Sequence, residues 1–392
     1  MNVALDRLRR AAACAVACLA LGASQVQAKD EVSVAFIGPL TGGVSAIGIG
    51  ARNSASLAVA LRNQDPKAKY TYNLVALDDE CKPNVGIQVA TKAATDKKII
   101  GAVAHYCSAV AMGTVNVFHE FGLPAIVWGA VLPEITSGND FDEVFRVNGT
   151  MLSQEFTASK FMTQQGFKTW AVIHDTTDYG KGHNKYFTKF ITDAGGKILG
   201  SFGVSSDQQD FTAELTQIKA LNPDVIYFAG LAPLGIRIRS QMDKLGLGDV
   251  QFEGASGIVS DTFAATLGPL AEGALAFHAG VPIAKLPGGR FFMAEYEKAG
   301  FKEPPEIWGP FSFAAMNLLL DTIEKVGPNR KAVVKALMDV KDAASIVGPI
   351  TFDKDGQNEL ALITTYIVQD GKWIPWEQSE YATGQRKLKK RP

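Results

Sequence analysis

The chain carries few residue patterns that could perform catalysis or hold a metal. Its five histidines are scattered, with no His-x-x-x-His pair and no Cys-x-x-Cys, so the spacing typical of a metal site is missing. The run Gly254-Ala255-Ser256-Gly257 lacks the second spacer of a Gly-x-Ser-x-Gly nucleophile elbow. Gly48-Ile49-Gly50 fits a dinucleotide-binding turn only loosely, because Asn53 stands where the third glycine belongs. We therefore expect no catalytic residue, no metal and no cofactor.

Three loops could instead bind a small anion. They span residues 38–50, 106–108 and 129–131, and each follows an expected strand. In open α/β sheets, ligands bind beyond the carboxyl ends of strands, and the free N–H groups at helix N-termini attract carboxylates. Helix caps use the same residue types for stability alone, so both interpretations of Ser108 remain open at this point.

The elements that must position these loops alternate along the chain. Continuous apolar runs, typical of strands buried on both faces, lie at residues 32–37, 74–77, 99–104, 124–128, 169–174, 225–229, 273–277, 348–353 and 362–368. Helical patterns lie at residues 53–63, 84–96, 111–121, 153–165, 181–194, 211–221, 311–326 and 331–340. This alternation predicts βαβ units with parallel sheets. At 392 residues, two α/β lobes are expected rather than one sheet.

Composition excludes several classes of protein. Hydrophobic residues make up 47% and charged residues 20%, so the chain as a whole is not disordered. The 39 basic and 40 acidic residues leave a formal net charge of -1, which gives no reason to expect nucleic acid as a partner. After the N-terminal segment, no apolar stretch reaches the length of a transmembrane helix.

The N-terminus predicts export. Arg7, Arg9 and Arg10 precede an apolar run at residues 11–22, and Val26-Gln27-Ala28 supplies small residues at a cleavage site. This is the three-part layout of a signal peptide, so we assign residues 1–28 to one that is cleaved near Ala28. The alternative is an amphipathic helix of a cytosolic protein. We do not expect lipidation at Cys18, because the residues before it lack the usual leucine.

The two remaining cysteines and the basic tail complete the sequence features. In an exported chain, Cys81 and Cys107 are expected to form a disulfide. Closing the loop between them would stabilise the folded chain by roughly 3–4 kcal/mol on a chain-entropy model. The alternative is that both cysteines are buried free thiols. The tail at residues 381–392 holds five basic residues from Arg386 to Arg391, and we expect a solvated, frayed end.

Seven blocks in order resemble one family. They are Ile37-Gly38-Pro39-Leu40-Thr41-Gly42, Asp78-Asp79-Glu80-Cys81-Lys82-Pro83, His105-Tyr106-Cys107-Ser108, Pro133-Glu134-Ile135-Thr136, Ile173-His174-Asp175 with Tyr179-Gly180, Asp210-Phe211, and Val347-Gly348-Pro349-Ile350. This order is similar to the leucine/isoleucine/valine-binding proteins, the periplasmic solute receptors of branched-chain amino-acid ABC transporters. The resemblance runs from about Val32 to Asp370.

The resemblance implies a fold. The family has two Rossmann-like lobes with parallel sheets, joined by three crossover strands, in the periplasmic binding protein-like I architecture. Lobe 1 would span residues 29–147 and 280–349, and lobe 2 residues 148–279 and 350–380. The crossovers would fall near residues 146–148, 277–281 and 349–351.

The resemblance also implies a ligand site between the lobes. Ser108 would hold the ligand carboxylate together with the loop of Gly129, Ala130 and Val131. Tyr179 would line the second lobe. Further walls would come from Ile47, Leu231 and Phe313.

Two departures from the family pattern leave the ligand open. Val131 stands where the amino-acid binders have threonine, and Ser256 stands where they have the acid that pairs with the ligand ammonium. Burying an ammonium without a partner costs several kcal/mol. Either another acid (Glu253, Asp261, Asp175 or Asp178) takes this role, or the ligand is not an α-amino acid.

The function implied is that of a monomeric periplasmic receptor. It would close its hinge on a small amphiphilic carboxylate and dock on a membrane permease. We place a branched-chain amino acid slightly ahead of an aromatic or aliphatic carboxylate or amide. Two alternatives come from other functional classes. One is an exported α/β hydrolase in which Ser108 or Tyr179 is catalytic, and the other is a ligand sensor.

Overall fold

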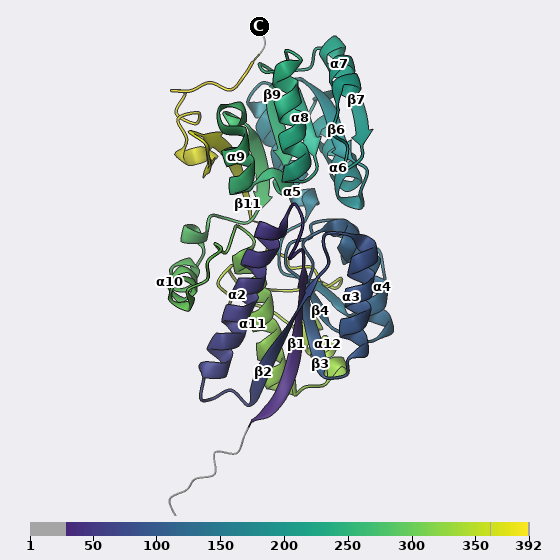
Figure 1. Cartoon of the computed structure of the whole chain (residues 1–392), viewed down its shortest axis with the longest axis vertical. Helices are drawn as coiled ribbons and strands as arrows, with labels where there is room; N and C mark the ends of the chain where they lie inside the picture. The colour runs from purple at the N-terminus through teal and green to yellow at the C-terminus, as the bar shows by residue number, and fades with distance from the viewer. Residues whose placement is uncertain (1–28, 361, 391–392) are drawn as a thin grey trace, which may run out of the picture.

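A computed structural model describes residues 29–360 and 362–390, which form two stacked lobes (Figure 1). Each lobe has one central sheet with helices on both faces. The expected fold class, two Rossmann-like lobes with parallel sheets, is confirmed. The expected signal peptide lies outside the described residues.

The first lobe contains a five-stranded parallel sheet in the order β2-β1-β3-β4-β5. Its strands are β1 (Asp30–Gly38), β2 (Tyr70–Asp78), β3 (Ile99–Ala104), β4 (Ala125–Val127) and β5 (Val144–Arg146). Every residue of β3 is buried, as expected for a strand covered on both faces.

The second lobe contains a seven-stranded sheet in the order β12-β11-β10-β9-β8-β6-β7. Its strands are β6 (Thr169–Asp175), β7 (Lys197–Val204), β8 (Val225–Ala229), β9 (Gln251–Ala255), β10 (Leu275–Ala279), β11 (Ile363–Gln369) and β12 (Lys372–Pro375). Strands β6 to β10 are parallel, and the last two run antiparallel to their neighbours.

The helices cover both faces of each sheet (Figure 1). Those of the first lobe are α2 (Ser45–Gln64), α3 (Pro83–Thr95), α4 (Ser108–Glu120), α10 (Gly289–Ala299), α11 (Gly309–Val326) and α12 (Arg330–Met338). Those of the second lobe are α5 (Met151–Gln164), α6 (Asp178–Asp193), α7 (Thr212–Leu221), α8 (Ala232–Lys244) and α9 (Asp261–Leu267). Helix α11 is apolar on nearly all sides because it packs between α2, α12 and the sheet.

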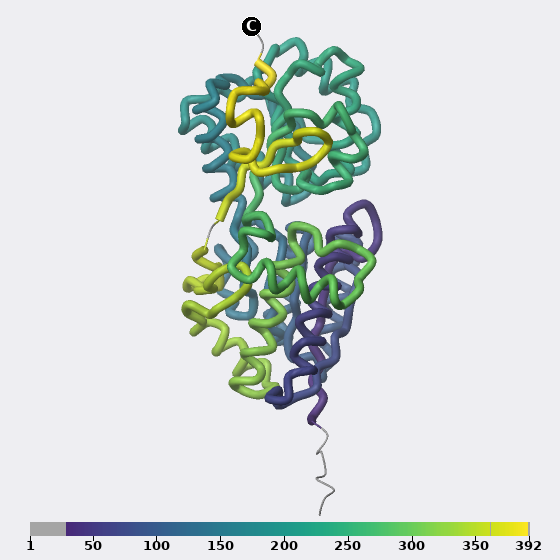
Figure 2. Tube along the Cα trace, turned by 90° about the vertical axis from the view of Figure 1, so that its left-hand side faces the viewer, coloured from purple at the N-terminus to yellow at the C-terminus, as the bar shows by residue number. Residues whose placement is uncertain are grey.

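The chain crosses between the lobes at the waist (Figure 2). The chain passes from the first lobe to the second after β5 and returns after β10. The third crossing was expected at residues 349–351, and this is wrong. Residues 350–358 still belong to the first lobe, because the Arg146 N–H donates to Gly356 O at 2.9 Å and the Phe145 ring contacts the ring of Phe352. The return to the second lobe therefore follows Asn358, whose side-chain amide donates to Val147 O.

The strand expected at residues 348–353 is also absent from this part of the described chain. Ile350 and Phe352 form only isolated bridges, to Ala343 and Asn358. Both side chains are buried. The apolar pattern therefore indicates the burial of this segment, but not whether it pairs with a neighbouring strand.

The basic tail is docked rather than frayed over its described part. Arg386 forms ion pairs with Glu272, Asp370 and Glu380. The Lys389 ammonium donates to Gly248 O at 2.7 Å. The tail therefore lies against the second lobe as far as residue 390 (Figure 2).

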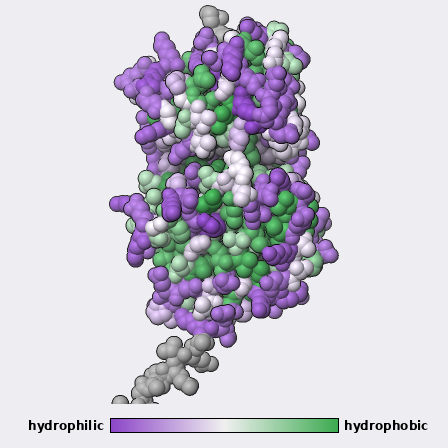
Figure 3. Space-filling view, in the orientation of Figure 1, coloured by the Kyte–Doolittle hydropathy of each residue, from purple (hydrophilic) through white to green (hydrophobic). Residues whose placement is uncertain are grey.

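No described helix is both long and apolar enough to cross a bilayer. On the face shown in Figure 3, hydrophilic side chains cover much of the second lobe, and hydrophobic side chains gather in the middle of the first lobe.

Candidate functional site

A cleft of about 680 Å³ lies between the two lobes. Its lining comes from loops at the carboxyl ends of strands in both sheets, together with Trp308, which precedes α11. The loops also approach each other across the cleft, since a Cβ on Gly43 would lie 3.0 Å from Pro233. A ligand held here would contact both lobes.

Ser108 forms the first-lobe end of the cleft. It is the first residue of α4 and is fully buried. Its Oγ accepts hydrogen bonds from the backbone N–H groups of Val131 and Leu132, at 3.2 and 3.3 Å. The hydroxyl proton stays available for an acceptor in the cleft. The side chain of Cys107, the N-cap residue, accepts no hydrogen bond from the first turn of α4. The first N–H groups of α4 therefore also favour an anion.

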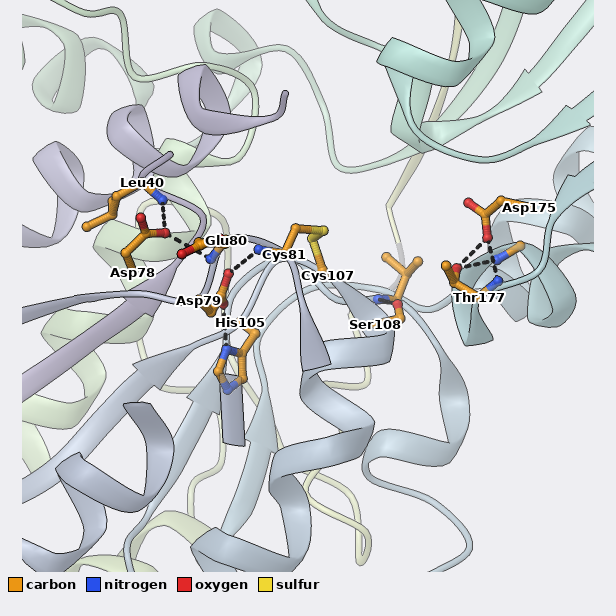
Figure 4. Close-up of a disulfide and its surroundings, with 12 residues drawn as sticks. Leu40, Asp78, Asp79, Glu80, Cys81, His105, Cys107, Ser108, Asp175 and Thr177 are labelled. Atoms are coloured by element: carbon orange, nitrogen blue, oxygen red, sulfur yellow. Dashed lines mark hydrogen bonds and ion pairs between the residues drawn. A yellow bond between two sulfur atoms is a disulfide. The ribbon is translucent and has the colours of Figure 1, made fainter. Parts of the chain in front are cut away.

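A disulfide fixes the loop that carries Ser108. Cys81 and Cys107 are bonded, with their Cα atoms 5.6 Å apart, and both line the cleft beside Ser108 (Figure 4). The expected pairing therefore forms. Glu80 and Cys81 have positive φ angles of 52° and 56°, a region that non-glycine residues adopt only when their surroundings hold them there.

A buried arginine supports the loop after β4 from behind. The Arg146 guanidinium donates to Leu132 O at 2.6 Å, to Ala130 O at 3.3 Å and to Thr136 Oγ1 at 2.9 Å. Burial lowers the pKa of Arg146 to about 9, so it remains a cation at neutral pH. No sequence pattern indicates this role, because most of the acceptors are backbone carbonyls.

Tyr179 and Ser256 form the second-lobe wall. The Tyr179 hydroxyl accepts from the Gly257 N–H at 2.8 Å and lies 3.4 Å from Ser256 Oγ. Burial raises the pKa of Tyr179 well above its usual value, so the phenol keeps its proton. The wall therefore offers hydroxyl groups, with Leu231 as an apolar neighbour.

Of the four acids considered for an ammonium, two line the cleft. Glu253 is fully buried beneath Trp170, whose Nε1 donates to it at 3.1 Å, and burial raises its pKa. Asp261 is exposed at the start of α9 and is not part of the lining. Asp175 and Asp178 do line it. Burial raises the pKa of Asp175, against hydrogen bonds from Thr177 that lower it.

The cleft brings together most of the expected site residues. Six of them line it: Ser108, Gly129, Val131, Tyr179, Leu231 and Ser256. Ile47 is buried within α2, and Ala130 faces Arg146 and Asn148 through its carbonyl; neither is among the lining residues.

Phe313 lies elsewhere, which corrects that expectation. Its ring packs against Phe292, and it lines a separate hollow of about 890 Å³ formed largely by α2, α11 and residues 339–350. Periodicity could not choose which face of the apolar helix α11 meets the cleft.

Two aromatic residues of the cleft were not anticipated. Tyr106 and Trp308 both line it, with their ring centroids 6.1 Å apart, and Tyr106 also stacks on Trp128. Tyr106 stood inside a block already singled out, between His105 and Cys107. No sequence pattern indicates that Trp308 lines the cleft, because it lies 200 residues after Ser108 in the chain.

The described residues include no group of three or more His, Cys, Asp or Glu side chains arranged to hold a metal ion.

The chain is similar to solute receptors over nearly its full described length. Residues 31–372 match the family model for periplasmic binding proteins. A leucine-, isoleucine-, valine-, threonine- and alanine-binding protein from Pseudomonas aeruginosa is 29% identical over 351 residues, covering 88% of this chain and 91% of that protein.

Two solved structures illustrate the match in fold. A leucine binding protein from Thermotoga maritima gives a TM-score of 0.80 at 24% identity, covering 88% of this chain and 97% of that one. An ABC-transporter solute binding protein from R. palustris, in complex with benzoate, gives 0.78 at 21% identity, covering 88% and 95%.

Proposed function

The chain belongs to the periplasmic binding protein family, among relatives of the leucine/isoleucine/valine-binding proteins, and from this we propose that it captures a small amphiphilic carboxylate for an ABC importer. The observation that carries the proposal is the two-sided cleft. One lobe offers Ser108 and the N-terminus of α4, and the other offers Tyr179, Ser256 and Leu231.

The carboxylate end of the ligand would lie against Ser108. Its Oγ accepts from the Val131 and Leu132 amides, and its own proton has no acceptor among the described residues. Hydrogen bonds to a charged acceptor contribute about 1.5–3 kcal/mol. The helix N-terminus adds a favourable partial charge. The apolar body would contact Val131, Leu231 and Trp308.

A branched-chain amino acid is the first candidate ligand. Asp175 supports it, because this acid is 3% exposed and lines the second-lobe side of the cleft. Asp175 would pair with the ligand ammonium in place of the acid that the amino-acid binders have at the position of Ser256.

An aromatic carboxylate is the second candidate. The rings of Tyr106 and Trp308 favour a flat ligand, since aromatic pairs gain about 0.5–1.5 kcal/mol beyond burial. Ser256 adds a hydroxyl where an ammonium would need an acid. The benzoate complex of a structural relative supports the same possibility.

A receptor role fits the site better than catalysis. The groups bonded to Ser108 Oγ are backbone amides, and neither can act as a base. The Tyr179 hydroxyl likewise meets an amide and a serine. The permease partner, the periplasmic location and the monomeric state are proposed from the family.

Calorimetric titration with L-leucine, L-valine, benzoate and p-coumarate tests the proposal. We expect saturable binding of at least one carboxylate with a 1:1 stoichiometry. Binding of benzoate but not leucine would exclude the amino-acid version. Binding of none of the four would count against the proposed ligand class.

A further inference from the structure

A buried Asp–His pair lies beneath the disulfide and Ser108. Asp79 follows β2 and His105 follows β3, and their side chains are 0% and 1% exposed. Asp79 Oδ2 lies 2.8 Å from His105 Nδ1 (Figure 4). Because a carboxylate accepts, Nδ1 carries the proton. On the other side of the ring, Nε2 lies 3.0 Å from the hydroxyl of Thr114 on α4.

Asp79 holds the loops that follow β1 and β2. Its N–H donates to Gly38 O at 3.1 Å, and its carbonyl accepts from the Lys82 N–H at 2.9 Å. Its Oδ1 accepts from the Cys81 N–H at 2.9 Å. These bonds close the turn in which Glu80 and Cys81 take positive φ, and the turn places Cys81 against Cys107.

His105 holds the loops that follow β3 and β4. Its carbonyl accepts from the Ala130 N–H at 3.1 Å. The next residue along that loop, Val131, donates to Ser108 Oγ. The side chains of Asp79, His105 and Thr114 thus join the loops after β2 and β3 to α4. The backbone groups of Asp79 and His105 bond to the loops after β1 and β4. None of the three residues lines the cleft.

We propose that Asp79, His105 and Thr114 are positioning residues that set the affinity of the cleft for a carboxylate. This inference rests on the proposed function and deepens it. A ligand binds more tightly when its partners are already fixed in the bound geometry. The network acts through Ser108. The direction in which the Ser108 hydroxyl donates its proton depends on the loop that carries Cys107 and on the amides of Val131 and Leu132.

The test pairs two substitutions at one position. Thr114→Val keeps the shape and removes the hydroxyl, and Thr114→Ser keeps the hydroxyl. With L-leucine and benzoate as probes in calorimetry, we expect Thr114→Val to weaken binding about tenfold. We expect Thr114→Ser to bind within about twofold of the unaltered protein. Asp79→Asn should weaken binding at least as much as Thr114→Val.

Hydrogen exchange gives a readout that needs no ligand. In the free protein, the amides of Cys81, Ala130 and Val131 should exchange faster in Thr114→Val and Asp79→Asn, and Thr114→Ser should restore slow exchange. Normal circular dichroism would show that each variant is folded.

Two control variants separate positioning from general stability. Ser312→Ala removes a buried hydroxyl bonded to Ala51 O at 2.8 Å, and should lower the melting temperature without changing affinity. His119→Gln breaks an exposed contact between His119 and the Glu143 carboxylate, which has the same 2.8 Å length as the buried contact between His105 and Asp79. This variant should change neither the melting temperature nor the affinity.

The outcomes distinguish the two proposals. Unchanged affinity and unchanged amide exchange in both Thr114→Val and Asp79→Asn would overturn the positioning role. If the unaltered protein binds neither probe nor any other carboxylate, the proposed function fails, and the exchange rates alone decide whether the network holds these loops.

Discussion

Ser108 is the residue on which the proposed ligand contact depends most. It is buried, it begins α4, and its oxygen already accepts two amides. Ser108→Ala should weaken carboxylate binding about tenfold to a hundredfold, because a hydrogen bond to a charged group is lost. Calorimetry measures this, with Ser256→Ala as a companion that should matter less to the carboxylate. Equal affinity of Ser108→Ala and the unaltered protein would contradict the assignment.

His278 should make the protein less stable in acid. Burial lowers its pKa to about 3, and its ring contacts Trp308 and Tyr366. The unfolded chain therefore takes up a proton first as the pH falls below about 6.5. The free energy of unfolding should fall by about 1.4 kcal/mol per pH unit from this residue, between roughly pH 6 and pH 3.

Urea unfolding at pH 7.5 and pH 5 measures this loss. His278→Phe retains an aromatic ring and should lose less stability between the two pH values. His119→Phe, at an exposed position, is the matched control and should follow the unaltered protein. The same pH dependence for His278→Phe would show that this histidine does not drive the effect.

At the scale of elements, the disulfide joins the loop before α3 to the loop before α4. Replacing both Cys81 and Cys107 with serine should lower the free energy of unfolding by about 3–4 kcal/mol, on the loop-entropy model. Guanidinium unfolding measures it. A reductant should destabilise the unaltered protein and leave the double variant unchanged; no effect of the reductant on either would contradict the expectation.

Local pattern was enough to predict the elements that are buried on both faces. Strands β3 and β8 were read from continuous apolar runs because every residue in them is buried. Strand β7 was missed, since this edge strand is mostly exposed or half-buried and contains two glycines. The sequence pattern does not reveal helix α8, because its charged residues are not confined to one face: Arg237 is half-buried, whereas Arg239 is buried.

Contacts between distant segments were beyond a sequence argument. A charge run usually indicates a frayed end, but Arg386 pairs with Glu272, which lies 114 residues earlier, and with Asp370, which lies 16 residues earlier. The cleft residues from both lobes were found through the resemblance, but Trp308 and the true place of Phe313 depend on how α11 packs. No periodicity encodes that orientation.

At the scale of the whole molecule, three chain crossings join lobes that a ligand could hold together. A ligand that contacts both lobes stabilises the closed state. Small-angle scattering should therefore show a smaller radius of gyration in saturating ligand. Ser108→Ala at the same ligand concentration should compact less. An unchanged radius in the unaltered protein, with binding proven by calorimetry, would argue against hinge closure.

A crystal structure with the tightest-binding carboxylate of the titration panel is the most direct test of the proposed site. We predict that the ligand carboxylate lies within hydrogen-bond distance of Ser108 Oγ, with Tyr179 and Leu231 against its other side. A ligand bound outside the cleft, for example in the hollow between α2 and α11, or bound in the cleft without contact to Ser108, would contradict it.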